Sequence, residues 1–179
     1  MSNNSIYLKE TKKVMGGVQK LYSFPNGYGA SGDAGHITQP DEHGAGAAYA
    51  MAGALRDASI EPTAIDYINA HGTSTPLGDK AETLAVKEVF GDHAKALSIS
   101  STKSSLGHSL GASGGIELVL CAKAIQNNVV PPTINLDTPD PECALDYTPN
   151  QPREPQLNYA MSNRLGFGGH NASVWIRGI

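Results

Sequence analysis

The order of hydrophobic and polar positions along the chain predicts helices and strands that alternate. Apolar residues recur at helical spacing in three segments, and short apolar runs of strand length lie between and after them. In chain order, the sequence predicts a strand near 18–24, a helix over 45–58, a strand over 65–70, a helix over 79–90, a strand over 97–101, a helix over 107–127, and strands over 157–162 and 172–176. This alternation is typical of an α/β fold with a partly parallel sheet.

Residues with special backbone or capping preferences indicate where these elements end. Asp79 is the expected N-cap of the second helix, Gly91 is expected to end it, and Asn128 is expected to stop the third. The proline-rich segment 135–155 has no clear periodicity and predicts a loop with at most a short strand near 145–147. A glycine turn joins the last two strands, which we expect to pair as an antiparallel hairpin at the sheet edge.

Composition and charge exclude several kinds of partner and location. The chain has 179 residues, enough for one domain with its own core, and its formal net charge is -4. It has no basic stripe and no apolar run long enough to cross a bilayer, so we expect neither a nucleic-acid nor a membrane partner. Its amino terminus does not resemble a secretory signal and two cysteines make no disulfide framework, so we expect a cytoplasmic protein. Residues 1–22 are polar and are expected to form an atypical arm before a domain over 23–179.

Two patterns suggest a nucleotide cofactor or a metal, but their surroundings do not support either. Residues 27–32 fit G-x-G-x-x-G, yet a dinucleotide site needs that loop to open a helix, and polar residues with Pro40 follow instead. No two of the six histidines have the i, i+4 spacing of helical metal ligands, and neither Cys121 nor Cys143 lies near one. We therefore expect neither a dinucleotide nor a metal site.

A third pattern, G-x-S-x-G at 107–111, is a more serious alternative because it is the nucleophile elbow of serine acyltransferases and hydrolases. Ser109 would be the nucleophile, and Asp137 and His170 follow it in the right order to complete a triad. An elbow needs an apolar strand that runs directly into the serine, whereas the residues before Ser109 are polar. A serine acyltransferase or thioesterase, and equally a non-catalytic remnant or scaffold, stay open as alternatives.

Two histidines follow successive predicted strands, where the loops of a parallel sheet converge at one edge. His71 comes directly after one strand, and Thr73 and Thr75 alternate after it, so their hydroxyls are expected to face the same side. His108 follows the next strand at the expected amino-terminal end of a helix, where the helix dipole favours a neutral imidazole. The glycine loop 166–169 is suited to presenting N–H groups to an oxyanion. We expect the two imidazoles to lie within several ångströms of each other, facing a common cleft.

These motifs, together with two others, resemble the β-ketoacyl–acyl-carrier-protein synthases, and within them the elongating bacterial enzymes. The likeness runs from about Gly27 to the end of the chain. Its segments are N-A-H-G-T-S-T-P-L-G-D-K-A-E-T at 69–83, S-T-K-S-S-L-G-H at 101–108, G-A-S-G-G at 111–115, P-P-T-I-N-L-D at 131–137 and G-F-G-G at 166–169. The resemblance implies a thiolase-like fold, in which two similar halves stack as α-β-α-β-α layers. This chain would be the carboxy-terminal half, with a mixed five-stranded sheet and packed helices.

The resemblance also implies a reaction, the decarboxylative condensation of fatty-acid elongation. In the family an acyl chain is held as a thioester on a cysteine, malonyl carrier protein is decarboxylated, and the carbanion attacks the thioester. His71 and His108 match the two active-site histidines. Lys103 matches the active-site lysine, and we expect Glu82 to form an ion pair with it near His108.

Further matches concern how the substrate is held. Thr73 and Thr75 match the threonines that bind the phosphopantetheine arm of acyl carrier protein. Phe167 matches a gating phenylalanine whose N–H contributes to the oxyanion hole, and Gly168 follows it in the same loop. The implied partner is acyl carrier protein, and no cofactor beyond its phosphopantetheine is expected.

The chain departs from the family pattern in two respects. The family nucleophile lies in a Thr-Ala-Cys-Ser-Ser-like turn, which this sequence lacks, and we expect Cys121 in its apolar helix and Cys143 in the proline loop to be inert. Arg164 and His170 stand where the family usually has serine and threonine around the glycine loop. We therefore expect a chain that is inactive alone and that needs its missing amino-terminal half or a homo-oligomer.

Overall fold

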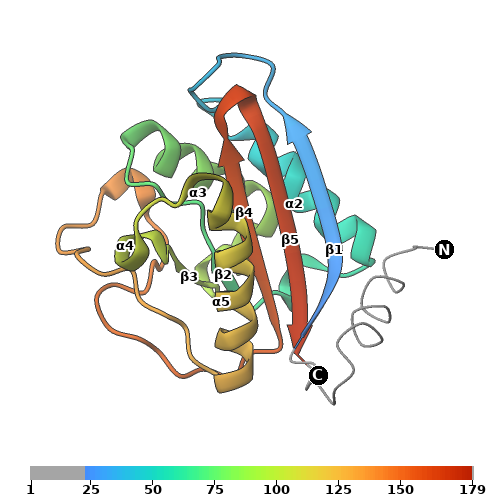
Figure 1. The fold of residues 1–179 in the computed structure, drawn as a ribbon, viewed down its shortest axis with the longest axis vertical. Coiled ribbons are helices and arrows are strands. Elements are labelled where there is room, and N and C mark those ends of the chain that lie inside the picture. The colour runs from blue at the N-terminus through green and yellow to red at the C-terminus, as the bar shows by residue number, and fades with distance from the viewer. Residues whose placement is uncertain (1–22, 179) are drawn as a thin grey trace.

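Five strands form one mixed sheet in the order β1–β5–β4–β2–β3 (Figure 1). This computed structural model describes residues 23–178. The pairs β2–β3 and β2–β4 are parallel, whereas β4–β5 and β1–β5 are antiparallel. The strands are β1 (Ser23–Gly32), β2 (Tyr67–Asn69), β3 (Ser98–Ser100), β4 (Tyr159–Gly166) and β5 (His170–Gly178). The three parallel strands therefore lie together at one side of the sheet, as the alternating sequence pattern predicted.

Helices cover both faces of this sheet and enclose a separate apolar core on each. The α-helices are α2 (Ala45–Ala58), α3 (Pro76–Phe90), the short α4 (Lys103–Leu106) and α5 (Ser113–Asn127). Helices α2 and α3 share a core with Ile68 and Met161, whereas α5 packs on the other face against Tyr67 and Ala160 (Figure 1). Successive strand residues thus alternate between the two cores, and because both faces are covered, β2 is buried along its whole length. No helix of the described part of the chain is long and apolar enough to span a membrane.

The three predicted long helices are present with the expected ends, but two of their starts are wrong. Helix α2 spans 45–58 as expected, α3 ends before Gly91, and α5 ends before Asn128. Asn128 adopts the left-handed conformation, with φ 52° and ψ 47°. Asp79 is not an N-cap, because the helix begins at Pro76, whose fixed φ suits the first helical position. The predicted helix over 107–127 is interrupted, and α5 begins only at Ser113.

The sheet edge differs from the prediction. The β4–β5 hairpin is antiparallel as expected, but it is not at the edge, because β1 pairs along the full length of β5. The predicted strand near 18–24 lies almost wholly outside the described residues, and the segment 145–147 is not part of a strand. Isolated bridges from Val130 to Arg153 and from Thr133 to Pro149 hold the proline-rich loop instead.

The glycine-rich segment 27–32 belongs to strand β1 and has a packing function. A Cβ atom on Gly29 would lie 2.0 Å from the carbonyl oxygen of Ala50, and one on Gly27 would lie 2.3 Å from that of Ala54. These glycines let the backbone of α2 approach the strand closely. The segment is therefore not a dinucleotide-binding loop, in agreement with the sequence analysis.

A substitution pair tests this close approach. Gly29→Ala should lower the free energy of unfolding by about 1–3 kcal/mol, because the added methyl group forces α2 away from β1. Gly32→Ala is the matched control, since a Cβ at Gly32 meets nothing within 4 Å. Urea unfolding of both variants measures the difference, and equal stabilities would show that glycine is not required at position 29.

Candidate active site

His71 lies just beyond the end of β2, in a loop whose backbone is fixed by a buried carboxylate. The backbone N–H groups of His71 and Gly72 each donate to a different oxygen of Glu82 on α3, both at 2.9 Å. Ser101, just past β3, donates its hydroxyl to the Gly72 carbonyl at 2.7 Å. Gly72 has a φ of +37°, and a Cβ there would lie 2.6 Å from Ser101 Cβ. The loops after two parallel strands are therefore locked together at the position where His71 emerges.

Glu82 does not pair with Lys103, so the expected ion pair is wrong. Its Oε1 accepts a further hydrogen bond, at 3.2 Å, from Asn163 Nδ2 on β4. The carboxylate is thus occupied by two backbone N–H groups and an amide. Burial raises the pKa of Glu82, and the three hydrogen bonds oppose that shift. Glu82 therefore positions the His71 loop rather than neutralising a cation.

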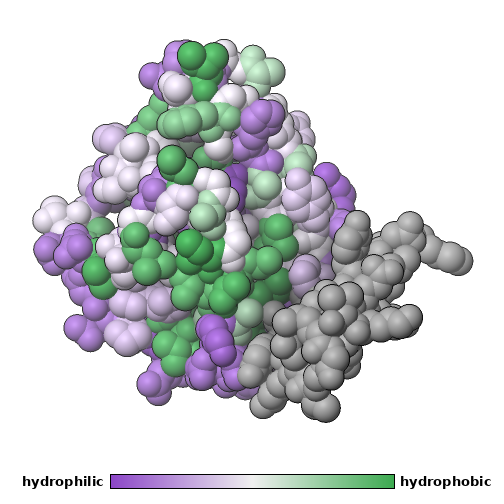
Figure 2. All heavy atoms as spheres, viewed as in Figure 1, coloured by the Kyte–Doolittle hydropathy of each residue, from purple (hydrophilic) through white to green (hydrophobic). Residues whose placement is uncertain are grey.

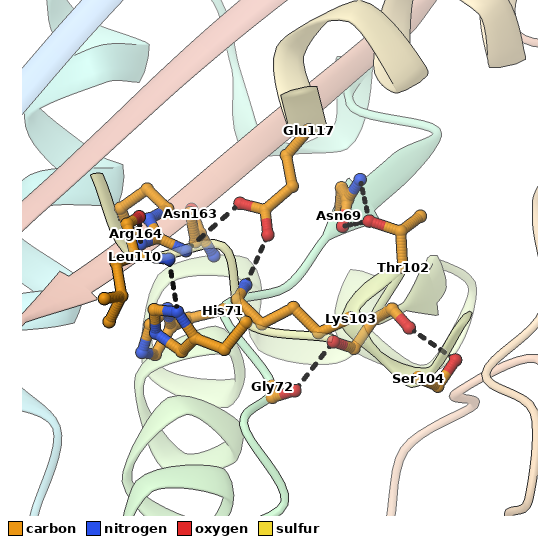
Figure 3. Close-up of polar contacts among 12 residues, drawn as sticks. Asn69, His71, Gly72, Thr102, Lys103, Ser104, Leu110, Glu117, Asn163 and Arg164 are labelled. Carbon is orange, nitrogen blue, oxygen red and sulfur yellow. Dashed lines mark hydrogen bonds and ion pairs between the residues drawn. The ribbon is translucent and has the colours of Figure 1, made fainter. Parts of the chain in front are cut away.

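The partner of Lys103 is Glu117, a residue that the sequence analysis missed. Lys103 Nζ lies 2.5 Å from Glu117 Oε1, and the two side chains are only 5% and 3% exposed. Arg164 approaches the same carboxylate from β4, with its Nη1 3.4 Å from Glu117 Oε2 (Figure 3). The available signal was a single acidic residue within the otherwise apolar stretch 116–122. Burial lowers the pKa of Lys103, and the bond to Glu117 partly restores it.

His108 lies in the exposed segment between α4 and α5, not at the start of a long helix. Gly107, with φ 74° and ψ 179°, ends α4, and α5 begins five residues after His108. The Leu110 N–H donates to His108 Nδ1 at 2.9 Å. This contact requires an unprotonated Nδ1, so in the neutral ring Nε2 carries the proton and serves as the donor. His108 therefore does not lie at a helix amino terminus as expected, and a backbone hydrogen bond from Leu110 orients its ring instead.

The two imidazoles lie together, which confirms the expected proximity. Their ring centroids are 5.7 Å apart and the rings are nearly perpendicular, at 88°. The pKa of His71 is lowered from 6.5 to about 3, first by burial and then by the nearby charges of Lys103 and Arg164 and by His108. His71 is consequently neutral at pH 7. Within residues 23–178 its buried Nδ1 has no hydrogen-bond partner.

The structure describes local contacts for the predicted substrate-binding residues. Thr73 and Thr75 face the same side as expected, and their hydroxyl oxygens are 3.2 Å apart. The Phe167 side chain is 74% exposed in the turn between β4 and β5. The Gly168 N–H, however, donates to the Ile37 carbonyl at 2.7 Å, so it is not free to bind an oxyanion.

The geometry around Ser109 does not match a nucleophile elbow. The short helix α4 stands between β3 and Ser109, so no strand runs into the serine. Within residues 23–178 its hydroxyl forms no hydrogen bond to His170, and Asp137 instead accepts one from Asn150 at 3.1 Å. These positions lack the contacts of a serine–histidine–acid triad.

Neither cysteine has the environment of a nucleophile. Cys121 is fully buried in α5, and burial raises the pKa of its thiol to about 12. The pKa of Cys143 is also raised, mainly by burial. Because the thiolate is the reactive species, both thiols are unreactive at neutral pH, as the sequence predicted.

Two further features of the described residues lie apart from this chemistry. No group of three or more potential metal-ligating side chains occurs among them. A surface hollow of about 730 Å³ lies beside α2, where Tyr49, Arg56 and Glu88 contribute to its lining. None of its lining residues belongs to the histidine site, so the hollow does not mark the reactive centre.

Comparison with known proteins places the chain in a family. Residues 22–137 match the family described as "Beta-ketoacyl synthase, C-terminal domain", and the chain belongs to that family. Over 152 residues it is 55% identical to a 3-oxoacyl-[acyl-carrier-protein] synthase 2 of Staphylococcus aureus (strain COL), a match that covers 85% of this chain and 37% of the relative. The synthase 2 of Coxiella burnetii is 51% identical over 154 residues, covering 86% and 37%. The chain thus spans little more than a third of the relatives' length and matches their carboxy-terminal part.

Solved structures agree with this placement and identify the thiolase-like fold. A ketosynthase of a type II polyketide synthase, solved with its acyl-carrier protein, superposes with a TM-score of 0.89 at 38% identity, covering 95% of this chain and 41% of that one. A β-ketoacyl synthase of Burkholderia phymatum STM815 gives a TM-score of 0.85 at 40% identity, covering 95% and 40%. The chain is therefore a carboxy-terminal, thiolase-like half of a ketosynthase.

The depressed pKa of His71 predicts a dependence of stability on pH. Because the folded chain resists protonating His71 while the unfolded chain does not, the folded state loses stability as the pH falls from 6.5 towards 3. Relative to His71→Gln, which has no group to titrate, the wild-type free energy of unfolding should fall by up to about 1.4 kcal/mol per pH unit in this window. Urea unfolding between pH 8 and 4 measures the difference, and a constant difference would mean that His71 titrates normally when folded.

Proposed function

We propose that this chain supplies the histidine half of a 3-oxoacyl-acyl-carrier-protein synthase, a transferase of fatty-acid biosynthesis. The observation that carries the proposal is the pair of adjacent, differently held imidazoles: His71 just after β2, and His108 in the segment between α4 and α5. Both are suited to act as neutral hydrogen-bond donors, because His71 is buried beside cations and Leu110 holds Nδ1 of His108. Neutral donors stabilise a developing enolate without transferring a proton to it.

The chemistry that this geometry suits begins with the loss of carbon dioxide from a malonyl thioester. The electron pair of the broken C–C bond is delocalised onto the thioester oxygen, where the Nε2–H of His108 would donate. The carbanion then forms a new C–C bond to the carbonyl carbon of an enzyme-bound acyl thioester, the C–S bond breaks, and the enzyme sulfur leaves as a thiolate. Burial, with the charges of Lys103 and Arg164 added to it, keeps His71 neutral, and Glu117 holds those two cations in place. Thr73 and Thr75 would hold the carrier arm.

The nucleophilic thiol has to come from a further polypeptide segment, because burial raises the pKa values of both Cys121 and Cys143 and leaves them as unreactive thiols.

An exposed apolar surface is suited to receive such a segment. It consists of Leu106, Leu110, Ile116 and Val119 on α4, α5 and the turn between them, and Figure 2 shows apolar side chains gathered over this region. Large exposed apolar surfaces are unusual on monomers and mark interfaces. We infer an amino-terminal half, or a second copy of the chain in its absence, as the occupant.

Acyl carrier protein is the proposed substrate carrier. One structural relative was solved as a ketosynthase with its acyl-carrier protein, and another as a ketosynthase with a chain length factor. Apart from the carrier's phosphopantetheine, the proposed reaction requires no cofactor, since the leaving carbon dioxide and thiol balance the bond that forms. The proposed compartment is the cytoplasm, because two cysteines make no disulfide framework.

This function can be tested by combining the chain with the amino-terminal part of a related synthase. The chain would be mixed with the amino-terminal part of the Staphylococcus aureus synthase 2, and 3-oxoacyl product formed from malonyl carrier protein would be measured by mass spectrometry. Each part alone should give no condensation product, and the assembled complex should give one. His108→Ala should lower the rate by about 10²–10³-fold, because one enolate donor is lost.

Ser109→Ala is the matched control for the rival chemistry. It changes the neighbouring residue and should leave the rate unchanged, because within residues 23–178 no hydrogen bond joins the Ser109 hydroxyl to a histidine. Turnover by the chain alone that depends on Ser109, Cys121 or Cys143 would refute the proposal. An assembled complex that forms no product would refute it equally.

A further inference from the structure

The segment that carries His108 has little support from its surroundings. Residues 105–112 are all exposed, and Leu110 has the unfavourable φ of +49° for a residue with a side chain. A Cβ atom at either Gly107 or Gly111 would meet nothing within 4 Å. Packing therefore does not fix this segment, although the site requires His108 to remain 5.7 Å from His71.

Arg164 provides the missing support from the neighbouring strand. Its Nη2 donates to the Leu110 carbonyl at 3.2 Å, and its Nη1 lies 3.4 Å from Glu117 Oε2 (Figure 3). The start of α5 lies against its aliphatic stem, since a Cβ at Gly114 would be 3.7 Å from Arg164 Cγ. The guanidinium thus joins the exposed segment to a carboxylate that is buried.

Leu110, which Arg164 holds, also orients His108. The carbonyl of Leu110 accepts from Arg164, and its N–H donates to His108 Nδ1 at 2.9 Å. The chain of contacts runs from the buried Glu117 through Arg164 and Leu110 to the His108 ring. A movement of Leu110 would break the only hydrogen bond that selects the ring tautomer among the described contacts of His108.

We propose that Arg164 is a positioning residue that fixes the tautomer and orientation of His108 through Leu110. This role rests on the proposed function of His108 but concerns its geometry, which is measurable without turnover. The planar guanidinium presents two donors in fixed directions, so it can hold the carboxylate and the carbonyl at once. A lysine ammonium at position 164 would keep the charge beside Glu117 but could not span both acceptors in the same way.

The test compares Arg164→Ser and Arg164→Lys with the wild-type chain by NMR. Nitrogen-15 shifts of the imidazole report the His108 tautomer, and amide hydrogen exchange reports the hydrogen bond of the Leu110 N–H. In the wild type, Nε2 should carry the proton. Both variants should show a mixture of tautomers and about tenfold faster exchange at Leu110, the effect of losing roughly one hydrogen bond.

Arg164→Lys keeps the test decisive even if Arg164→Ser does not fold, because it retains the cation beside Glu117. Arg56→Ser, on the exposed side of α2, is the control and should change neither signal. A purely structural role for Arg164 would lower stability and leave the tautomer as it is. An unchanged His108 tautomer and unchanged Leu110 exchange in folded Arg164→Lys would overturn the proposal, whether or not the reconstituted enzyme is active.

Discussion

The Glu117 carboxylate, buried between two cations, is the interaction on which the site depends. Lys103 approaches it from the short helix after β3, and Arg164 approaches it from β4, so one carboxylate joins three elements. Removing its charge would leave two cations partly or wholly buried without their shared counter-charge. The loss of stability would be far larger than the stabilisation that the ion pair itself contributes. Burial is the main cause of the lowered pKa of the nearby His71, and the same two cations lower it further, so this ion triad links the packing of α5 to the chemistry of the site.

A second buried carboxylate has a different task on the opposite face of the sheet. Glu82 accepts two backbone N–H groups from the His71 loop, whereas Glu117 binds side-chain cations. Consecutive residues of β4 reach both acids, because Asn163 donates to Glu82 and Arg164 to Glu117. Side chains alternate across a strand, so β4 connects the supports of the two histidines through the sheet.

The order of elements and the histidine pair could be predicted because both depend on local patterns. The spacing of apolar residues predicted the helix over 45–58, and motifs that follow successive strands predicted the site. The partner of Lys103 was missed because both Glu82 and Glu117 lie on predicted helices, and the sequence does not show which helix covers which face of the sheet. The interruption before α5 was missed because small residues are compatible with a helix and with the turns found here. The sheet edge was missed because the glycines of β1 are explained only by contact with α2.

Measurement of the unfolding free energy of Glu117→Gln at pH 7 tests most directly whether the buried carboxylate organises the site. The substitution keeps the shape of the side chain and removes its charge. The free energy should fall by about 3–5 kcal/mol, because Lys103 and Arg164 lose their shared partner. Glu142→Gln, which removes the charge from an exposed pair with Lys80, is the matched control and should change stability little. A loss for Glu117→Gln no larger than that of the control would contradict the account.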